Sequence, residues 1–164
     1  MAEQTDQYVL THTMPRVKDL DRSLRFYREV LDMRLVKRFD FEEAKFTLCF
    51  LQPRGNKDQA DGTVESTFAV GGLLELTYNW GSEKDENLQM HSGNTEPKGF
   101  GHICIAVPDI EAACRRFDGH GVEFQKRLGQ GGMKEIAFIK DPDGYWIEIV
   151  QPSLMQDLVG KAAR

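Results

Sequence analysis

Residues 12–33 read HTMPRVKDLDRSLRFYREVLDM, and residues 102–124 read HICIAVPDIEAACRRFDGHGVEF. Each stretch opens on a histidine, has a valine five residues later and an aspartate seven residues later, and then enters a run of apolar residues spaced by three and four. That spacing is typical of a helix with one buried face. An internal repeat of this kind predicts one folding unit that is built twice.

Strand-like sequence follows each helical stretch. The apolar segments are KFTLCFLQ (45–52), STFAV (66–70) and LLELTYNW (73–80) in the first half, and KEIAFIKD (134–141) and YWIEIVQ (145–151) in the second. The DPDG before Tyr145 places proline and glycine where a tight hairpin turn needs them. Each half therefore predicts a β-α-β-β-β module, and the chain predicts an α+β fold.

Composition divides the chain further. Polar, Gly- and Pro-containing sequence marks the connections, including an exposed insertion at PRGNKDQADGTVE (53–65). We expect an N-terminal arm (1–10), a first βαβββ module (11–80), a linker loop (81–100), a second βαβββ module (101–152) and a C-terminal tail (153–164), which is either a peripheral tail or a short helix.

Charge and cysteine content limit the function classes. The chain has 164 residues, with 21 Lys and Arg against 26 Asp and Glu, and a formal net charge of −5. This acidic balance argues against nucleic-acid binding, which depends on clustered positive charge. No apolar run reaches the roughly 18 residues of a membrane span, and MAEQTDQYVL lacks the apolar core of a signal peptide. Cys49, Cys104 and Cys114 lack metal-type spacing and are interpreted as core or interface residues of a cytoplasmic protein.

Two histidines and two glutamates fall at matched places in the two halves. His12 and His102 begin the first strand of each module, and Glu75 and Glu148 lie in the apolar strands that close them. Taken singly, a strand glutamate often faces solvent, and a histidine is more often structural than a ligand. Because pseudo-symmetric modules bring equivalent strands to one concave face, these four side chains are predicted to surround one point. Imidazole and carboxylate suit Zn²⁺, Ni²⁺, Co²⁺ or Fe²⁺.

The residues from His12 to Pro152 closely resemble the glyoxalase I family of the vicinal-oxygen-chelate superfamily. The resemblance lies in HTMPRVKDLDRSLRFYREVLDM, LLELTYNWG, GNTEPKGFGHICIAVPDI and AFIKDPDGYWIEIVQP. It implies paired βαβββ modules with curved mixed sheets enclosing a metal site, in a homodimer with its active sites at the interface. It also implies one divalent ion per site, and the ligands would be His12 and Glu75 from one chain with His102 and Glu148 from the other.

The resemblance extends to the metal and the reaction. DENLQMHSGNTEPKGFGH and the insertion 53–65 resemble the longer form of the family, which favours zinc over nickel or cobalt. The implied activity is lactoylglutathione lyase, which isomerises the hemithioacetal of methylglyoxal and glutathione to S-lactoylglutathione and so detoxifies methylglyoxal. A glutamate takes a proton from one carbon and returns it to the next through an enediolate that the metal stabilises. The resemblance implies that Glu148 is the principal base and Glu75 its counterpart.

Glutathione has two carboxylates, so its pocket needs cations and hydrogen-bond donors. The family pattern implies contacts from Arg16, Asn79, Lys98, Lys126, Gly132 and Met133. Strand alternation places Arg16 on the same face as His12, and Asn79 on the same face as Glu75. Phe68 and Leu76 are candidates for an apolar pocket around the methyl group, or for plain core.

Two other functions remain open on this sequence. The first is a different metalloenzyme of the same superfamily, such as a ring-cleaving dioxygenase or an epimerase. Iron dioxygenases use two histidines and one carboxylate, whereas two His–Glu pairs and the Arg16/Asn79 combination favour the isomerase. The second is a metal-free protein that binds a small molecule, which has no need for two His–Glu pairs.

Overall fold

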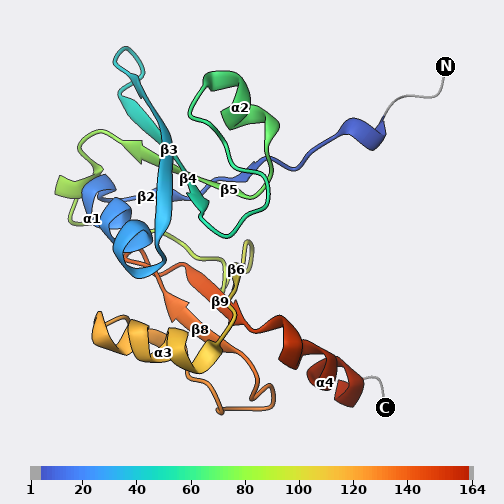
Figure 1. The fold of residues 1–164 in the computed structure, drawn as a ribbon. Helices are drawn as coiled ribbons and strands as arrows, with labels where there is room; N and C mark the ends of the chain where they lie inside the picture. The colour runs from blue at the N-terminus through green and yellow to red at the C-terminus, as the bar shows by residue number, and fades with distance from the viewer. Residues whose placement is uncertain (1–4, 163–164) are drawn as a thin grey trace. The chain divides into compact units, whose positions relative to one another are not determined.

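The computed structural model describes residues 5–162 and divides into two units between Gln89 and Met90 (Figure 1). Each unit contains one mixed sheet, and a helix follows the strand or strands with which the unit begins. Residues 1–4 of the expected N-terminal arm and 163–164 of the expected tail lie outside the described residues. No helix in the described part is long and apolar enough to cross a membrane.

The first unit is a five-stranded sheet with the order β1-β5-β4-β3, in which β2 also pairs with β5. The first strands, β1 and β2, run parallel to the last strand, β5, and the remaining pairs are antiparallel. Its elements are η1 (Thr5–Gln7), β1 (His12–Thr13), β2 (Arg16–Val17), α1 (Leu20–Arg25), the π-helical η2 (Phe26–Val30), β3 (Met33–Phe41), β4 (Phe46–Pro53), α2 (Val64–Ala69), β5 (Leu73–Asn79) and η3 (Ser82–Lys84).

The second unit repeats this topology. Its sheet has the order β6-β9-β8-β7, and its first strand again lies parallel to its last. Its elements are β6 (His102–Ala106), α3 (Ile110–Gly119), β7 (Phe124–Lys126), β8 (Ala137–Lys140), β9 (Trp146–Val150) and α4 (Pro152–Ala162). The α+β fold and the presence of two βαβββ units, predicted from the sequence, are therefore confirmed.

The two module helices begin in the same way. The carboxylate of Asp19 accepts a hydrogen bond from the backbone N–H of Arg22 at 3.0 Å, and Asp109 accepts one from Ala112 at 2.9 Å. Such caps satisfy backbone donors that have no partner inside the helix, and each contributes about 1 kcal/mol. The aspartate seven residues after each histidine therefore fixes where the helix starts.

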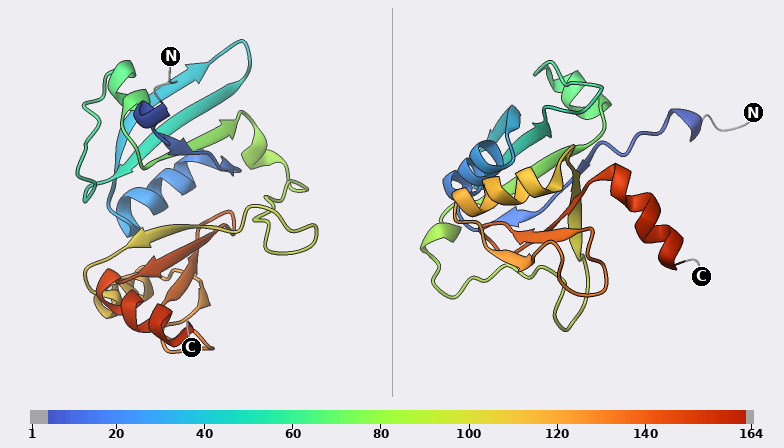
Figure 2. Two further views of the ribbon diagram at one scale, coloured as in Figure 1. Left: turned by 90° about the vertical axis from the view of Figure 1, so that its right-hand side faces the viewer. Right: turned by 60° about the horizontal axis from the view of Figure 1, so that its bottom comes forward.

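Two details of the predicted modules are wrong. Of the segment 66–70, predicted as a strand, residues 66–69 belong to helix α2, because the Thr63 hydroxyl accepts from the backbone N–H of Ser66 at 3.1 Å and starts a helix there. The strand that directly follows each module helix was not among the predicted segments. It is β3 in the first module, where it pairs with β4, and β7 in the second, where it pairs with β8. By contrast, the short helix expected as one form of the C-terminal tail is present: α4 follows the end of β9 (Figures 1 and 2).

Strand alternation separates a packed face from a face that carries the polar groups. In β9, Ile147 and Ile149 are fully buried, whereas Glu148 between them is partly exposed. In β5, Leu74 and Leu76 belong to the core, and Glu75 points to the other face. Each sheet thus presents its glutamate on the face opposite its main apolar core.

Candidate metal centre and active site

The first unit brings His12 and Glu75 together. β1 pairs with β5 so that His12 lies opposite Leu73, which places Glu75 two residues further along on the same face. The His12 Nε2 atom is 3.1 Å from Glu75 Oε2, and the two side chains are 28% and 11% exposed. A ring nitrogen and a carboxylate oxygen therefore lie side by side in a largely desolvated position.

The second unit builds the same pair in the same register. His102 lies opposite Trp146, two residues before Glu148. The His102 Nε2 atom is 3.4 Å from Glu148 Oε2, and these side chains are 41% and 20% exposed. The duplication recognised in the sequence therefore extends from the fold to the geometry of the candidate ligands.

A phenylalanine beside each pair was missed by the sequence analysis. Phe50 lies opposite Glu75, and Phe138 lies opposite Glu148. Their rings meet the neighbouring imidazoles edge to face, with centroids 5.4 Å apart for His12 and 5.3 Å apart for His102. Such contacts favour one orientation of the imidazole ring. The spacing from phenylalanine to glutamate differs greatly between the halves, so the sequence carried no simple signal for this match.

Further polar groups surround each pair. The Thr77 hydroxyl donates to Glu75 Oε1 at 3.1 Å, and Thr11 Oγ1 lies 2.9 Å from His12 Nδ1. In the second unit, Cys104 lies opposite Glu148. Partial burial and a hydrogen bond to the Glu148 carboxylate raise the pKa of the Cys104 thiol to about 11. Both glutamates are thus hydrogen-bonded on their site faces, but to different donors.

The two pairs have the donor chemistry of a metal site. Neutral imidazole and carboxylate bind Zn²⁺, Ni²⁺, Co²⁺ and Fe²⁺, and each pair already places one nitrogen and one oxygen at a common point. Within residues 5–162, no group of three or more His, Cys, Asp and Glu side chains lies close enough to hold a metal ion. Either unit alone therefore offers two protein ligands, fewer than a zinc site requires.

The expected glutathione contacts of the first unit share the face of Glu75. Arg16 pairs with Thr77, and Asn79 follows two residues later, so strand parity puts both on the site face. Arg16 and Asn79 are exposed. Both exposed side chains therefore share a face with the His12–Glu75 pair.

In the second unit, the Lys126 side chain is hydrogen-bonded to the loop that contains Gly132 and Met133. Its ammonium group donates to the carbonyl oxygens of Met133 and of Ile136, the latter at 2.7 Å. Partial burial lowers the pKa of Lys126. Lys98 lies in the irregular segment before β6, exposed and 3.6 Å from a Glu96 carboxylate oxygen. The structure thus brings Lys126 together with Met133 and pairs Lys98 with Glu96.

Of the two candidates for an apolar pocket, Phe68 lies beside the candidate site and Leu76 lies in the core. Phe68 of α2 packs on Phe50 with ring centroids 5.3 Å apart and lies 6.2 Å from the His12 ring. Leu76 is fully buried on the opposite face of β5 and belongs to the core. Of the two interpretations of Cys104, as a core or an interface residue, the first is wrong, because Cys104 is exposed on the face of Glu148, and the second stays a prediction.

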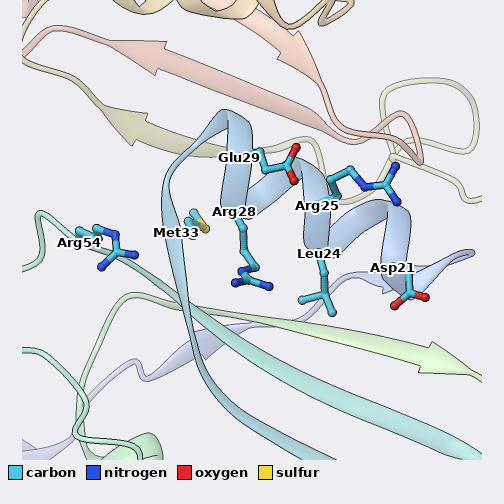
Figure 3. Close-up of a pocket in the computed structure, with 7 residues that line it drawn as sticks. All are labelled: Asp21, Leu24, Arg25, Arg28, Glu29, Met33 and Arg54. Carbon is cyan, nitrogen blue, oxygen red and sulfur yellow. The ribbon is translucent and has the colours of Figure 1, made fainter.

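A separate pocket of about 470 Å³ lies beside α1 and η2 (Figure 3). It is lined by Asp21, Leu24, Arg25, Arg28, Glu29, Met33 and Arg54, all outside the predicted site residues. Arg25 and Arg28 extend in different directions from the helix (Figure 3). Arg54 forms an ion pair with Asp32, in which Arg54 Nε lies 3.2 Å from Asp32 Oδ1. The three guanidinium groups therefore do not converge on one ligand.

Residues 9–149 match the Glyoxalase/Bleomycin resistance protein/Dioxygenase superfamily. The chain is 57% identical over 153 residues to a lactoylglutathione lyase of Pseudomonas aeruginosa, covering 92% of this chain and 86% of that protein. It is 52% identical over 156 residues to a lactoylglutathione lyase of Schizosaccharomyces pombe, covering 93% of this chain and 51% of that protein. Among solved structures, the trypanothione-dependent glyoxalase I of Leishmania major superposes with a TM-score of 0.70, at 32% identity and 94% coverage of both chains.

Proposed function

The chain belongs to the Glyoxalase/Bleomycin resistance protein/Dioxygenase superfamily, and we propose that it is a lactoylglutathione lyase. The substrate is the hemithioacetal of methylglyoxal and glutathione, and the product is S-lactoylglutathione. The observation that carries the proposal is the repeated His–Glu pair, at 3.1 Å in one unit and 3.4 Å in the other, in a chain 57% identical to a relative of that activity.

The proposed cofactor is one divalent ion, with zinc favoured, held by His12, Glu75, His102 and Glu148. In support, each pair supplies two donors, and two equivalent pairs supply the four protein ligands expected around such an ion. We propose that the chain forms a homodimer in which one pair from each of two chains meets at an interface. When bound, the ion acts as a Lewis acid that stabilises negative charge on the substrate oxygens.

The chain's own glutamates move the proton. We assign Glu148 as the base that takes the proton from the hemithioacetal carbon and returns it to the adjacent carbon, with Glu75 as its counterpart on the other side. A positioned carboxylate contributes typically 10²–10⁴-fold to such a transfer. The rings of Phe50 and Phe68 pack beside His12 and give the Glu75 side of the site an apolar wall.

The remaining predicted residues bind the glutathione part. Arg16 and Asn79 lie on the face of Glu75 and are proposed to hold one end of the tripeptide. The glycyl carboxylate is assigned to Lys126 and to the loop at Gly132 and Met133, which Lys126 holds through the Met133 carbonyl. We propose that the Lys98 ammonium group leaves Glu96 and neutralises a carboxylate of glutathione. We also propose a cytoplasmic location, where glutathione is reduced and free thiols persist.

The test is reconstitution with metal. The purified chain is stripped with a chelator, its metal loss is checked by elemental analysis, and Zn²⁺ and Ni²⁺ are returned to separate samples. With methylglyoxal and glutathione, the reloaded enzyme should form thioester absorbance and the stripped enzyme should not. Full activity of the stripped enzyme, or no thioester with either metal, refutes the proposal. Oxygen consumption with a catechol substrate instead indicates a ring-cleaving dioxygenase.

A further inference from the structure

The two half-sites match at histidine, glutamate and phenylalanine, but they differ two residues after the glutamate. In β5 that position is Thr77, and in β9 it is Val150. Both occupy the same place in their sheets: Thr77 lies opposite Arg16, four residues after His12, and Val150 lies opposite Ala106, four residues after His102. The difference is therefore a change of side chain at an otherwise equivalent position.

The threonine holds one oxygen of Glu75. Its hydroxyl donates to Oε1 at 3.1 Å, while Oε2 faces His12. Both Thr77 and Glu75 are buried, so the bond is shielded from competing water. The Thr77 backbone is itself fixed, because its N–H donates to the carbonyl oxygen of Pro15 at 3.1 Å. The two carboxylate oxygens of Glu75 are thus held in two different directions.

Glu148 has no such hydroxyl. Val150 offers only methyl groups at the equivalent position, and the neighbouring donor on the facing strand is the Cys104 thiol, which is a weak hydrogen-bond donor. The Glu148 side chain is also more exposed than that of Glu75, at 20% against 11%. One oxygen of Glu148 faces His102, and the rest of the carboxylate is held less firmly.

We propose that Thr77 is a positioning residue that keeps Glu75 a fixed metal ligand, whereas Val150 leaves Glu148 free to turn from the metal toward the substrate carbon. This inference rests on the proposed isomerase function and explains how two equivalent glutamates take different parts in it. Thr77 acts through Glu75, because its hydroxyl is already committed to that carboxylate.

The experiment exchanges the two side chains. Thr77→Val removes the hydroxyl while nearly keeping the shape, Thr77→Ser keeps a hydroxyl, and Val150→Thr adds one beside Glu148. Zinc affinity is measured by competition with a chelator, without substrate, and kcat and KM are measured separately. Partners of metal ligands typically contribute 10–100-fold in affinity or activity.

We expect Thr77→Val to bind zinc about tenfold more weakly and Thr77→Ser to restore the affinity. Val150→Thr should lower kcat about tenfold with KM unchanged and with zinc bound at least as tightly as in the wild type, because the added hydroxyl fixes Glu148 and this carboxylate then turns less readily. Wild-type zinc affinity in Thr77→Val, or wild-type kcat in Val150→Thr, overturns the inference. A wild-type enzyme that forms no thioester overturns the proposed function itself, so the two failures are distinguishable.

Discussion

The substitution Glu148→Gln tests the assigned base most directly. Glutamine has nearly the shape of glutamate but cannot accept the substrate proton. Loss of a general base costs typically 10²–10⁴-fold in rate, which corresponds to about 3–5 kcal/mol in the barrier. The fold should survive, because Ile147 and Ile149 carry the packing of β9 from the opposite face and are fully buried.

The assay follows thioester absorbance with saturating hemithioacetal, after the zinc content of each protein is determined. The matched control is Glu42→Gln, an exposed glutamate in the turn between β3 and β4, which should keep wild-type kcat. If Glu148→Gln contains zinc, remains folded and retains wild-type kcat, the base has been assigned to the wrong residue.

Four other substitutions test the site and the fold. Lys98→Ala should raise KM more than it lowers kcat, because this lysine is assigned to the glutathione part; an unchanged KM in steady-state kinetics removes Lys98 from the site. Asp109→Ala should lower the unfolding free energy by about 1 kcal/mol in urea denaturation, since the cap of α3 is lost, and equal stability would contradict that role. Leu76→Ala should cost about 2–5 kcal/mol in the same assay because it opens a cavity in a fully buried position; a smaller loss would mean that the core collapses around it. Burial raises the pKa of the Cys49 thiol to about 11, so ionisation of this thiol favours the unfolded chain. The unfolding free energy should therefore fall between about pH 9 and 11, and that of Cys49→Ala should fall less over the same interval. An equal fall in both proteins contradicts this role of the thiol.

Much of the site could be predicted because its key residues recur at matching positions. A histidine at the start of the first strand and a glutamate inside the last are visible in one dimension. The parallel pairing of those strands then brings the residues together in both units. The helix caps can also be predicted from the sequence, because Asp19 and Asp109 each precede a periodic apolar run.

Other features depend on relations that are not local. STFAV has the composition of a strand, and only the Thr63 cap and the packing of α2 beside β3 make it helical. β3 mixes charged and apolar residues without regular alternation, and β7 has only three residues, so neither gave a strand signal. Phe50 and Phe138 hold equivalent places because strand register sets each of them opposite a glutamate. The sequence hides this match, because the segments between each phenylalanine and its glutamate differ in length.

The parallel pairing of first and last strands has a consequence for synthesis. His12 leaves the ribosome long before Glu75, and every other element of the first module lies between them in the chain. Contacts of such high sequence separation form late and slowly in folding. In a nascent chain His12 therefore stays without Glu75, and the His12–Glu75 pair forms only after the whole first module has closed on itself.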